Sequence, residues 1–169
     1  MNYVKAGILF FVLWLIQTTL LWRVWPFGAV PNLILCAAVC FAYLYNKNFA
    51  LIFAVAFGLM LDLQTQSLFG VTALTLVLSC VPAWILRGHF NPERALPGML
   101  SALIATAIYG FSLWGVYSLF GSPANVFLVI RELPALMISQ VLICFVLHIV
   151  FVRTIIKDRR DRRYIGGVV

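Results

Sequence analysis

Residues 133–152 read LPALMISQVLICFVLHIVFV, a run of twenty residues without Asp, Glu, Lys or Arg. An α-helix needs about 20 apolar residues to cross a lipid bilayer, so this stretch predicts a transmembrane helix. The whole chain has the same character: 64% of its 169 residues are hydrophobic, 10% are charged, and the mean hydropathy is +1.05. A soluble domain is about half apolar and about one quarter charged. The sequence therefore predicts an integral membrane protein.

Five more apolar runs precede this one, separated by short segments that contain turn residues. The six predicted spans cover residues 6–22, 30–45, 49–63, 68–86, 98–120 and 133–152. The predicted fold class is all-α: one polytopic domain over residues 1–152, with six transmembrane helices in one bundle, followed by a basic tail over residues 153–169. We expect the first span to remain in the protein, because no cleavage site of small residues follows it.

The Lys and Arg residues predict how the spans are oriented, because cytoplasmic loops are enriched in them. With a cytoplasmic N-terminus, only Arg23 and Arg131 of the twelve basic residues fall on the outer side. An odd number of spans would place the basic tail outside, so the charges favour six spans with both termini in the cytoplasm. The tail carries Lys157, Arg159, Arg160, Arg162 and Arg163. We expect it to contact anionic lipids; no nucleic-acid partner is predicted.

Asp62 is an acidic residue at the outer end of the third predicted span. It follows Ala50, Ala54 and Gly58 at steps of four residues, so three small residues and a carboxylate share one helix face. Such small-residue stripes let helix backbones approach closely. Asp62 has two interpretations: an ion or proton site, or an anchor that bonds to backbone amides or hydroxyls near the next turn. The anchor is favoured, because transporters usually show more than one intramembrane carboxylate.

The fifth predicted span carries a second stripe of small residues. Its members, again at steps of four, are Gly98, Ala102, Thr106 and Gly110. We expect this face to pack tightly against another helix, which belongs either to this chain or to a partner. Packing within the chain is the favoured interpretation.

The sixth predicted span carries Gln140, Cys144 and His148 on one face. This polar face has three interpretations: a polar pathway through the membrane, a metal site at Cys144 and His148, or hydrogen bonds between helices. Two potential ligands are too few for a specific metal site, so hydrogen bonding between helices is favoured. We also expect His148 to reach water, because it lies near the cytoplasmic end of the span.

The four cysteines lie inside apolar runs and form no CxxC pair; they are Cys36, Cys40, Cys80 and Cys144. We interpret them as small packing residues, with neither a disulfide nor a zinc site predicted. Pro82 lies inside the fourth span and is predicted to kink it. The hydroxyl groups of Thr72, Thr75 and Ser79 are candidates to satisfy the backbone groups that this proline frees.

Motifs that would indicate an enzyme are missing from the sequence. It contains no Gly-rich phosphate loop, no HExxH, no Ser/His/Asp arrangement and no acidic pair suited to catalysis. We therefore predict no catalytic residue, no cofactor and no metal. The pattern favours a helical bundle that binds a ligand in its interior or docks partner proteins.

Two segments carry a resemblance to a known family. The run from Gly58 to Asp62, the turn before Gly70 and the apolar helix through Leu74 resemble the signature of the bacterial rod shape-determining protein MreD family. The start of the second span, 31–33, is similar to the Pro-Asp-Leu of that family. This chain departs from the family pattern with Asn32 at the acidic position and Ala54 where a further Gly often occurs.

The resemblance implies a non-catalytic function at the bacterial cytoplasmic (inner) membrane. Proteins of this family belong to the cell-elongation machinery, which controls where side-wall peptidoglycan is made. They associate with MreC, and through it with MreB, RodA and the transpeptidase partner of RodA. The family fold is similar to the substrate-binding S components of energy-coupling-factor vitamin transporters.

That fold similarity supplies an alternative function: a vitamin-binding transporter subunit of the S-component type. Such subunits use an Ala-xxx-Ala pattern in the first span to dock their partner. Here Ala6 is followed four residues later by Phe10, so the pattern is absent. A third function, as an accessory of a lipid-precursor flippase or polymerase, finds no supporting motif in the chain.

Overall fold

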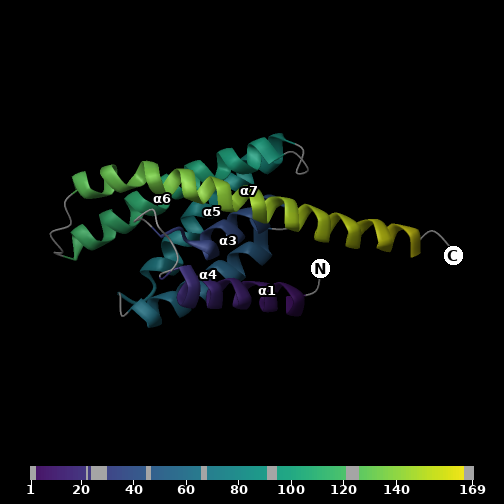
Figure 1. The fold of residues 1–169 in the computed structure, drawn as a ribbon, viewed down its shortest axis with the longest axis horizontal. Coiled ribbons are helices and arrows are strands. Elements are labelled where there is room, and N and C mark those ends of the chain that lie inside the picture. Colours follow the sequence, from purple (N-terminus) through teal and green to yellow (C-terminus); the bar gives the residue numbers. More distant parts are fainter. Residues whose placement is uncertain are drawn as a thin grey trace.

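The computed structural model describes residues 3–21, 23, 30–44, 47–65, 68–90, 95–120 and 126–165; the side chains of 3, 5, 47, 65, 128 and 153–165 are outside this description. Regular structure in these ranges is entirely helical (Figure 1). The elements are α1 Tyr3–Ile16, the π-helical turn η1 Gln17–Leu21, α3 Leu33–Leu44, α4 Lys47–Thr65, α5 Val71–His89, α6 Ala95–Leu119 and α7 Val126–Ile165. The prediction of an all-α fold is confirmed for the described part.

Helix α3 is the core of the bundle, and all of its residues are buried. Helices α1, α4, α5, α6 and α7 all pack against it. In Figure 1, α1 and α4 lie along one side of α3, and α6 and α7 lie along the other. An all-round apolar helix must be enclosed by protein or by lipid, and α3 is enclosed by its own chain.

Three helices are long and apolar enough to cross a membrane: Val71–His89, Ala95–Leu119 and Val129–Val152. The other three predicted spans correspond to shorter apolar helices, Ala6–Leu21, Leu33–Leu44 and Asn48–Gln64. The twelve residues of α3 rise only about 18 Å at ~1.5 Å each, against a hydrocarbon core of about 30 Å. A full span over residues 30–45 is therefore not confirmed, because this segment is a short helix inside the bundle.

Helix α7 begins earlier and ends later than the predicted sixth span. It starts at Val126, so Arg131 and Glu132, which the sequence places in the outer loop, lie inside the helix and are exposed. The helical backbone then continues beyond the span to Ile165. The backbone of the basic tail therefore continues helix α7. The lipid contacts expected of this tail concern its side chains, which lie outside the described part of the chain.

The helix α5 continues through Pro82, which is buried. The Thr75 hydroxyl donates a hydrogen bond to the Thr72 carbonyl at 3.0 Å, and the Ser79 hydroxyl donates to the Thr75 carbonyl at 2.7 Å. The carbonyl that Pro82 frees belongs to Leu78, four residues earlier. The expectation that these hydroxyls satisfy the groups freed by Pro82 is therefore wrong for Thr75 and Ser79, which bond to other carbonyls of α5.

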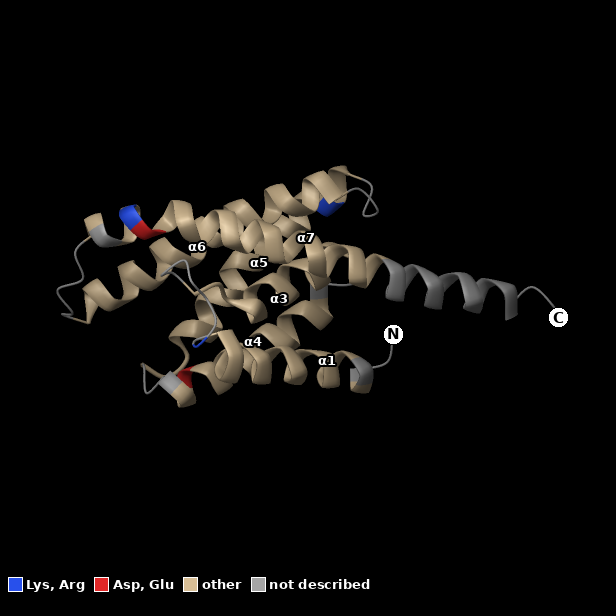
Figure 2. Cartoon of the chain, in the orientation of Figure 1, with Lys and Arg blue, Asp and Glu red and all other residues tan. Residues whose placement is uncertain are grey.

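The outer surface of the bundle is apolar between its two ends. Exposed side chains include Ile52, Leu100, Ile138 and Phe145. The described charged side chains lie towards helix ends (Figure 2) and are Arg23, Asp62, Arg87, Arg131 and Glu132. Monomeric soluble proteins rarely expose such continuous apolar area, whereas a lipid environment requires it. The structure is thus compatible with a membrane protein.

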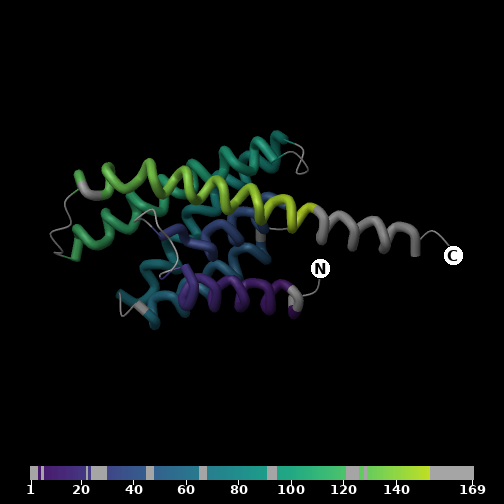
Figure 3. Tube along the Cα trace, in the orientation of Figure 1, coloured from purple at the N-terminus to yellow at the C-terminus, as the bar shows by residue number. Residues whose placement is uncertain are grey.

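The two ends of the described chain lie at the same end of the bundle. Figure 3 shows α1 starting, and the coloured part of α7 finishing, at the right of the view. Helix α6 runs away from that end and α7 returns to it. An even number of passes through the bundle gives this arrangement.

Candidate functional site

Asp62 joins the end of α4 to the start of α5. Its side chain is 1% exposed, and its carboxylate oxygens accept hydrogen bonds from the backbone N–H groups of Gly70 at 2.9 Å and Thr72 at 3.1 Å. These donors belong to the first turn of α5, where free N–H groups and the helix dipole favour a negative charge. The geometry is that of the anchor interpretation of Asp62, with backbone amides as its partners.

Gly70 shapes the turn that brings those amides to Asp62. Its φ of 91° is in the left-handed region, which costs a residue with a Cβ about 1 kcal/mol or more. Gly70 precedes α5 as its N-cap and makes no side-chain cap. The Asp62 carboxylate takes the place of that missing cap.

The stripe on α4 packs inside the chain. Ala50 and Ala54 are buried, and a Cβ added to Gly58 would lie 2.5 Å from the Cα of Ala73 and 2.9 Å from its backbone nitrogen. Only a glycine lets α4 approach α5 this closely. The α4 stripe is therefore a helix-packing face turned inward, rather than a surface open to a partner.

The stripe on α6 also faces neighbouring helices of the same chain. A Cβ on Gly98 would lie 3.3 Å from Nδ1 of His148, and a Cβ on Gly110 would lie 3.3 Å from Cδ2 of Leu133. Ala102 and Thr106 between them are buried. This face therefore packs against α7, which supplies both His148 and Leu133.

Gln140 of α7 binds the start of α3. Its side-chain nitrogen donates to the Asn32 carbonyl at 2.9 Å, and its side-chain oxygen accepts from the Asn32 N–H at 3.1 Å. Gln140 is 2% exposed. This pair of bonds joins residues 108 positions apart in the chain, in agreement with hydrogen bonding between segments as the role of Gln140.

Two further side chains complete the capping of α3, which begins in the interior of the bundle. Gln17 accepts a hydrogen bond from the N–H of Ile34 at 3.2 Å, and Asn32 accepts one from the N–H of Leu35 at 3.0 Å. The Asn32 side-chain nitrogen donates to the Tyr109 hydroxyl at 3.1 Å. A buried helix start needs such partners, because its first N–H groups have none within the helix.

The other polar residues of α7 are enclosed as well. Cys144 lies with its sulfur 3.3 Å from that of Cys40, and Cys36 donates to the Gln140 carbonyl at 3.4 Å. All four cysteines are free and buried, and the described residues contain no group of three or more His, Cys, Asp or Glu side chains placed to hold a metal ion. His148 is 3% exposed beside the ring of Tyr43, so the expectation that it reaches water is wrong.

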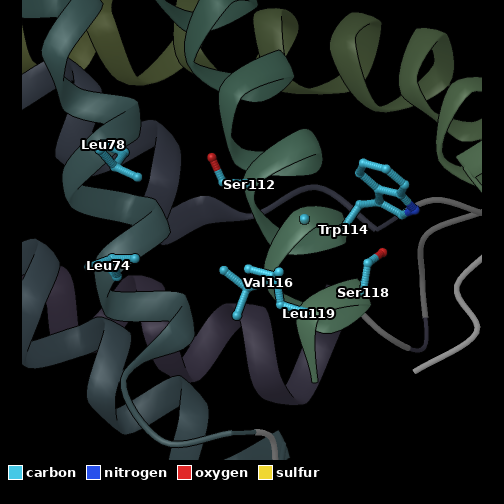
Figure 4. Close-up of a pocket in the computed structure, with 8 residues that line it drawn as sticks. Leu74, Leu78, Ser112, Trp114, Val116, Ser118 and Leu119 are labelled. Carbon is cyan, nitrogen blue, oxygen red and sulfur yellow. The ribbon is translucent and has the colours of Figure 1, made fainter. Parts of the chain in front are cut away.

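Two concave regions remain as candidate binding surfaces. The first is an apolar groove of about 560 Å³ between α5 and α6. Figure 4 shows Leu74 and Leu78 on α5 across from Val116 and Leu119 on α6. Gly115 also lines this groove, and a Cβ added there would meet nothing within 4 Å. The groove therefore has room for a side chain from another molecule.

The second region is a cavity of about 250 Å³ beside the start of α3. It is lined by polar groups of the capping network, namely Gln17, Asn32, Tyr109 and Gln140, and by Thr72 of α5. The sequence drew attention to Gln140 and Asn32 but not to Gln17 or Tyr109. No spacing signal links residues so far apart, because only the folded helices bring them together.

In comparisons with known proteins, no protein-family model, no curated protein and no solved structure matches the chain.

Proposed function

We propose that this chain is a non-catalytic membrane subunit of the bacterial cell-elongation complex. In this function it docks an MreC-type single-span protein and regulates side-wall peptidoglycan synthesis. Through that partner it is linked to MreB, RodA and the transpeptidase partner of RodA. The complex works at the cytoplasmic membrane.

One observation carries the proposal: Gly58, Asp62 and Gly70, from the longer segment of the MreD resemblance, form a single structural unit with the start of α5. Gly58 lies against Ala73, and Asp62 binds the backbone of Gly70 and Thr72. A motif that joins two helices in this way needs to perform no chemistry. It supports a structural function, in which the folded bundle presents a surface that partner proteins bind.

The groove between α5 and α6 is the surface that suits a partner helix. It lies on the apolar exterior, and its lining combines large residues such as Leu74 and Leu119 with the small residues Ser112, Gly115 and Ser118. Close approach of transmembrane helices depends on such small residues, since their backbones and hydroxyls give van der Waals contact and hydrogen bonds. The two stripes predicted from the sequence are already occupied within the chain.

In the proposed topology the chain crosses the membrane six times, with both termini in the cytoplasm. The shared end of α1 and α7 in the bundle supports an even number of crossings. The shorter helices would cross where the bundle itself thins the bilayer, a cost of fractions of a kcal/mol per Å of mismatch. The basic tail then lies at the cytoplasmic leaflet, where anionic lipids attract it.

The alternative function is that of an S-component-type vitamin transporter subunit. The first helix argues against it. Such a subunit docks its partner through small residues exposed on the first span. Here Ala6 and Phe10 are both fully buried, and Phe10 stacks on the rings of Phe53 and Phe57. The face in question is therefore used for packing within the chain.

The test is co-purification with an MreC-type protein from the same organism. Gly115→Leu places a large side chain in the groove from a position where an added Cβ meets nothing within 4 Å. We expect it to reduce the recovered partner about tenfold without lowering the thermal stability of the chain. Gly88→Leu is the matched control, because Gly88 is exposed on α5 and a Cβ there also meets nothing within 4 Å. It should leave recovery intact.

Two results would contradict the proposal. Equal recovery with both leucine variants would exclude the groove as the docking surface. Cells depleted of this chain that keep their rod shape would exclude the function itself. Gly58→Leu and Gly110→Leu are unsuited to this test, because both positions pack within the chain.

A further inference from the structure

The cavity beside the start of α3 has the composition of a small-molecule site. Its walls are mostly apolar and include Leu35, Leu61 and Leu136, and a few polar side chains converge on it. Binding sites for small molecules commonly combine an apolar lining with a few polar groups in this way. Its volume of about 250 Å³ equals roughly eight water molecules at ~30 Å³ each.

The hydrogen bonds around the cavity exclude an anionic ligand. The N–H groups of Asn32, Ile34 and Leu35 already donate to side-chain oxygens, so they are not available to bind an anion at the start of α3. None of the described lining residues is charged. A bound anion would therefore lie in a largely apolar site without a positive counter-charge, and close to the buried Asp62 carboxylate that Thr72 binds, at high cost in free energy.

Donor groups remain available on the cavity wall. The side-chain oxygen of Gln17 accepts a hydrogen bond from Ile34 of α3, and the NH₂ group of Gln17 has no acceptor among the described residues. The Thr72 hydroxyl likewise has none within that part of the chain, and the Tyr109 hydroxyl only accepts, from Asn32. Three helices thus each present a donor to one cavity: η1, α5 and α6.

We infer that this cavity binds a small neutral molecule with a hydrogen-bond acceptor, a carbonyl or ether oxygen, and a compact apolar body. The oxygen accepts from the donors of Gln17, Thr72 and Tyr109, and the apolar body lies against Leu35 and Leu136. Such a ligand joins η1, α5 and α6 and stabilises the folded bundle. This site is separate from the α5–α6 groove and does not depend on a partner protein.

The experiment uses cyclohexanone as the probe, with the full-length protein in lipid nanodiscs and no partner present. Ligand-observed NMR measures its affinity in the wild type and in Thr72→Val, which removes one donor at constant size. We expect about five- to tenfold weaker binding in the variant, which is the effect of losing about one hydrogen bond. Ser79→Ala is the control, because Ser79 is buried on the same helix, bonds to Thr75 rather than to Thr72, and does not line the cavity.

Further arms test the ligand chemistry. Methylenecyclohexane, which lacks the oxygen, should bind equally to the wild type and to Thr72→Val, and cyclohexanecarboxylate should not compete with cyclohexanone. Leu136→Trp should abolish cyclohexanone binding by filling the cavity. Four results overturn the inference: no binding of cyclohexanone to the wild type, which means that the cavity holds water only; equal affinity in Thr72→Val and wild type; the same loss in Ser79→Ala; or competition by the carboxylate.

Discussion

At the scale of single residues, Asp62 shows how well the sequence can predict the role of a side chain. A carboxylate beside a turn into the next helix has backbone N–H groups within reach, so the sequence could favour an anchor. Its two bonds to Gly70 and Thr72 have that form. The roles of Gln17 and Tyr109 could not be predicted, because their partners come from distant parts of the chain.

The first prediction concerns Asp62. Asp62→Ala should lower the free energy of unfolding by about 2–4 kcal/mol, because it leaves two buried N–H groups without an acceptor. Asp62→Asn keeps one oxygen acceptor and should lose about 1–2 kcal/mol. Denaturant or thermal unfolding of the purified protein measures both. Glu132→Gln serves as control, since Glu132 is exposed and the change should have an effect below ~0.5 kcal/mol.

The ion-site interpretation makes the opposite prediction for Asp62→Asn. It requires the variant to keep full stability and to lose ion or proton transport in loaded vesicles. That pair of results would contradict the anchor role.

At the scale of helices, the stripes of small residues show what periodicity can predict. Steps of four residues place Ala50, Ala54 and Gly58 on one face whatever their surroundings, so close packing was predictable from the chain. The identity of the neighbour was not. Only the folded bundle places Gly58 against Ala73 of α5 and Gly98 against His148 of α7.

The second prediction concerns the closest helix contact. Gly58→Ala should destabilise the protein by about 1–3 kcal/mol, although alanine is the better helix former by about 1 kcal/mol. The added Cβ would meet the backbone of Ala73, which cannot move as a flexible side chain does. Gly88→Ala is the control with open space and should be neutral or stabilising. Thermal unfolding of both variants measures the effect. Equal melting temperatures for Gly58→Ala and Gly88→Ala would contradict the close contact.

At the scale of the whole molecule, the exterior of the bundle is apolar, whereas its interior contains hydrogen-bonded polar groups. Apolar side chains cover the outside between two ends that carry the described charges. The interior holds the polar network that caps α3, because a helix that starts inside the bundle cannot use water for its free N–H groups. An apolar exterior, with the buried helix start bonded to side chains, is expected of a protein that uses lipid as its solvent.

The third prediction tests the proposed orientation. In a background with the four buried cysteines replaced by alanine, Arg131→Cys should react with a membrane-impermeant maleimide in right-side-out vesicles. Arg87→Cys should react only in inverted vesicles, because it lies at the opposite end of the bundle. Reversed labelling would mean that the chain is inserted the other way. Labelling of both from one side would contradict a crossing by α6, the helix between the two positions.

The sequence by itself determined the helical class, the apolar exterior and the faces suited to close packing. Each of these depends on composition or on a spacing of a few residues, which the chain carries locally. The tertiary structure alone decided that α3 is a short helix enclosed by its own chain, and that Gln17, Asn32, Tyr109 and Gln140 meet beside it. The physical reason is that burial and hydrogen bonding between distant residues depend on which helices pack together, and no local pattern encodes that choice.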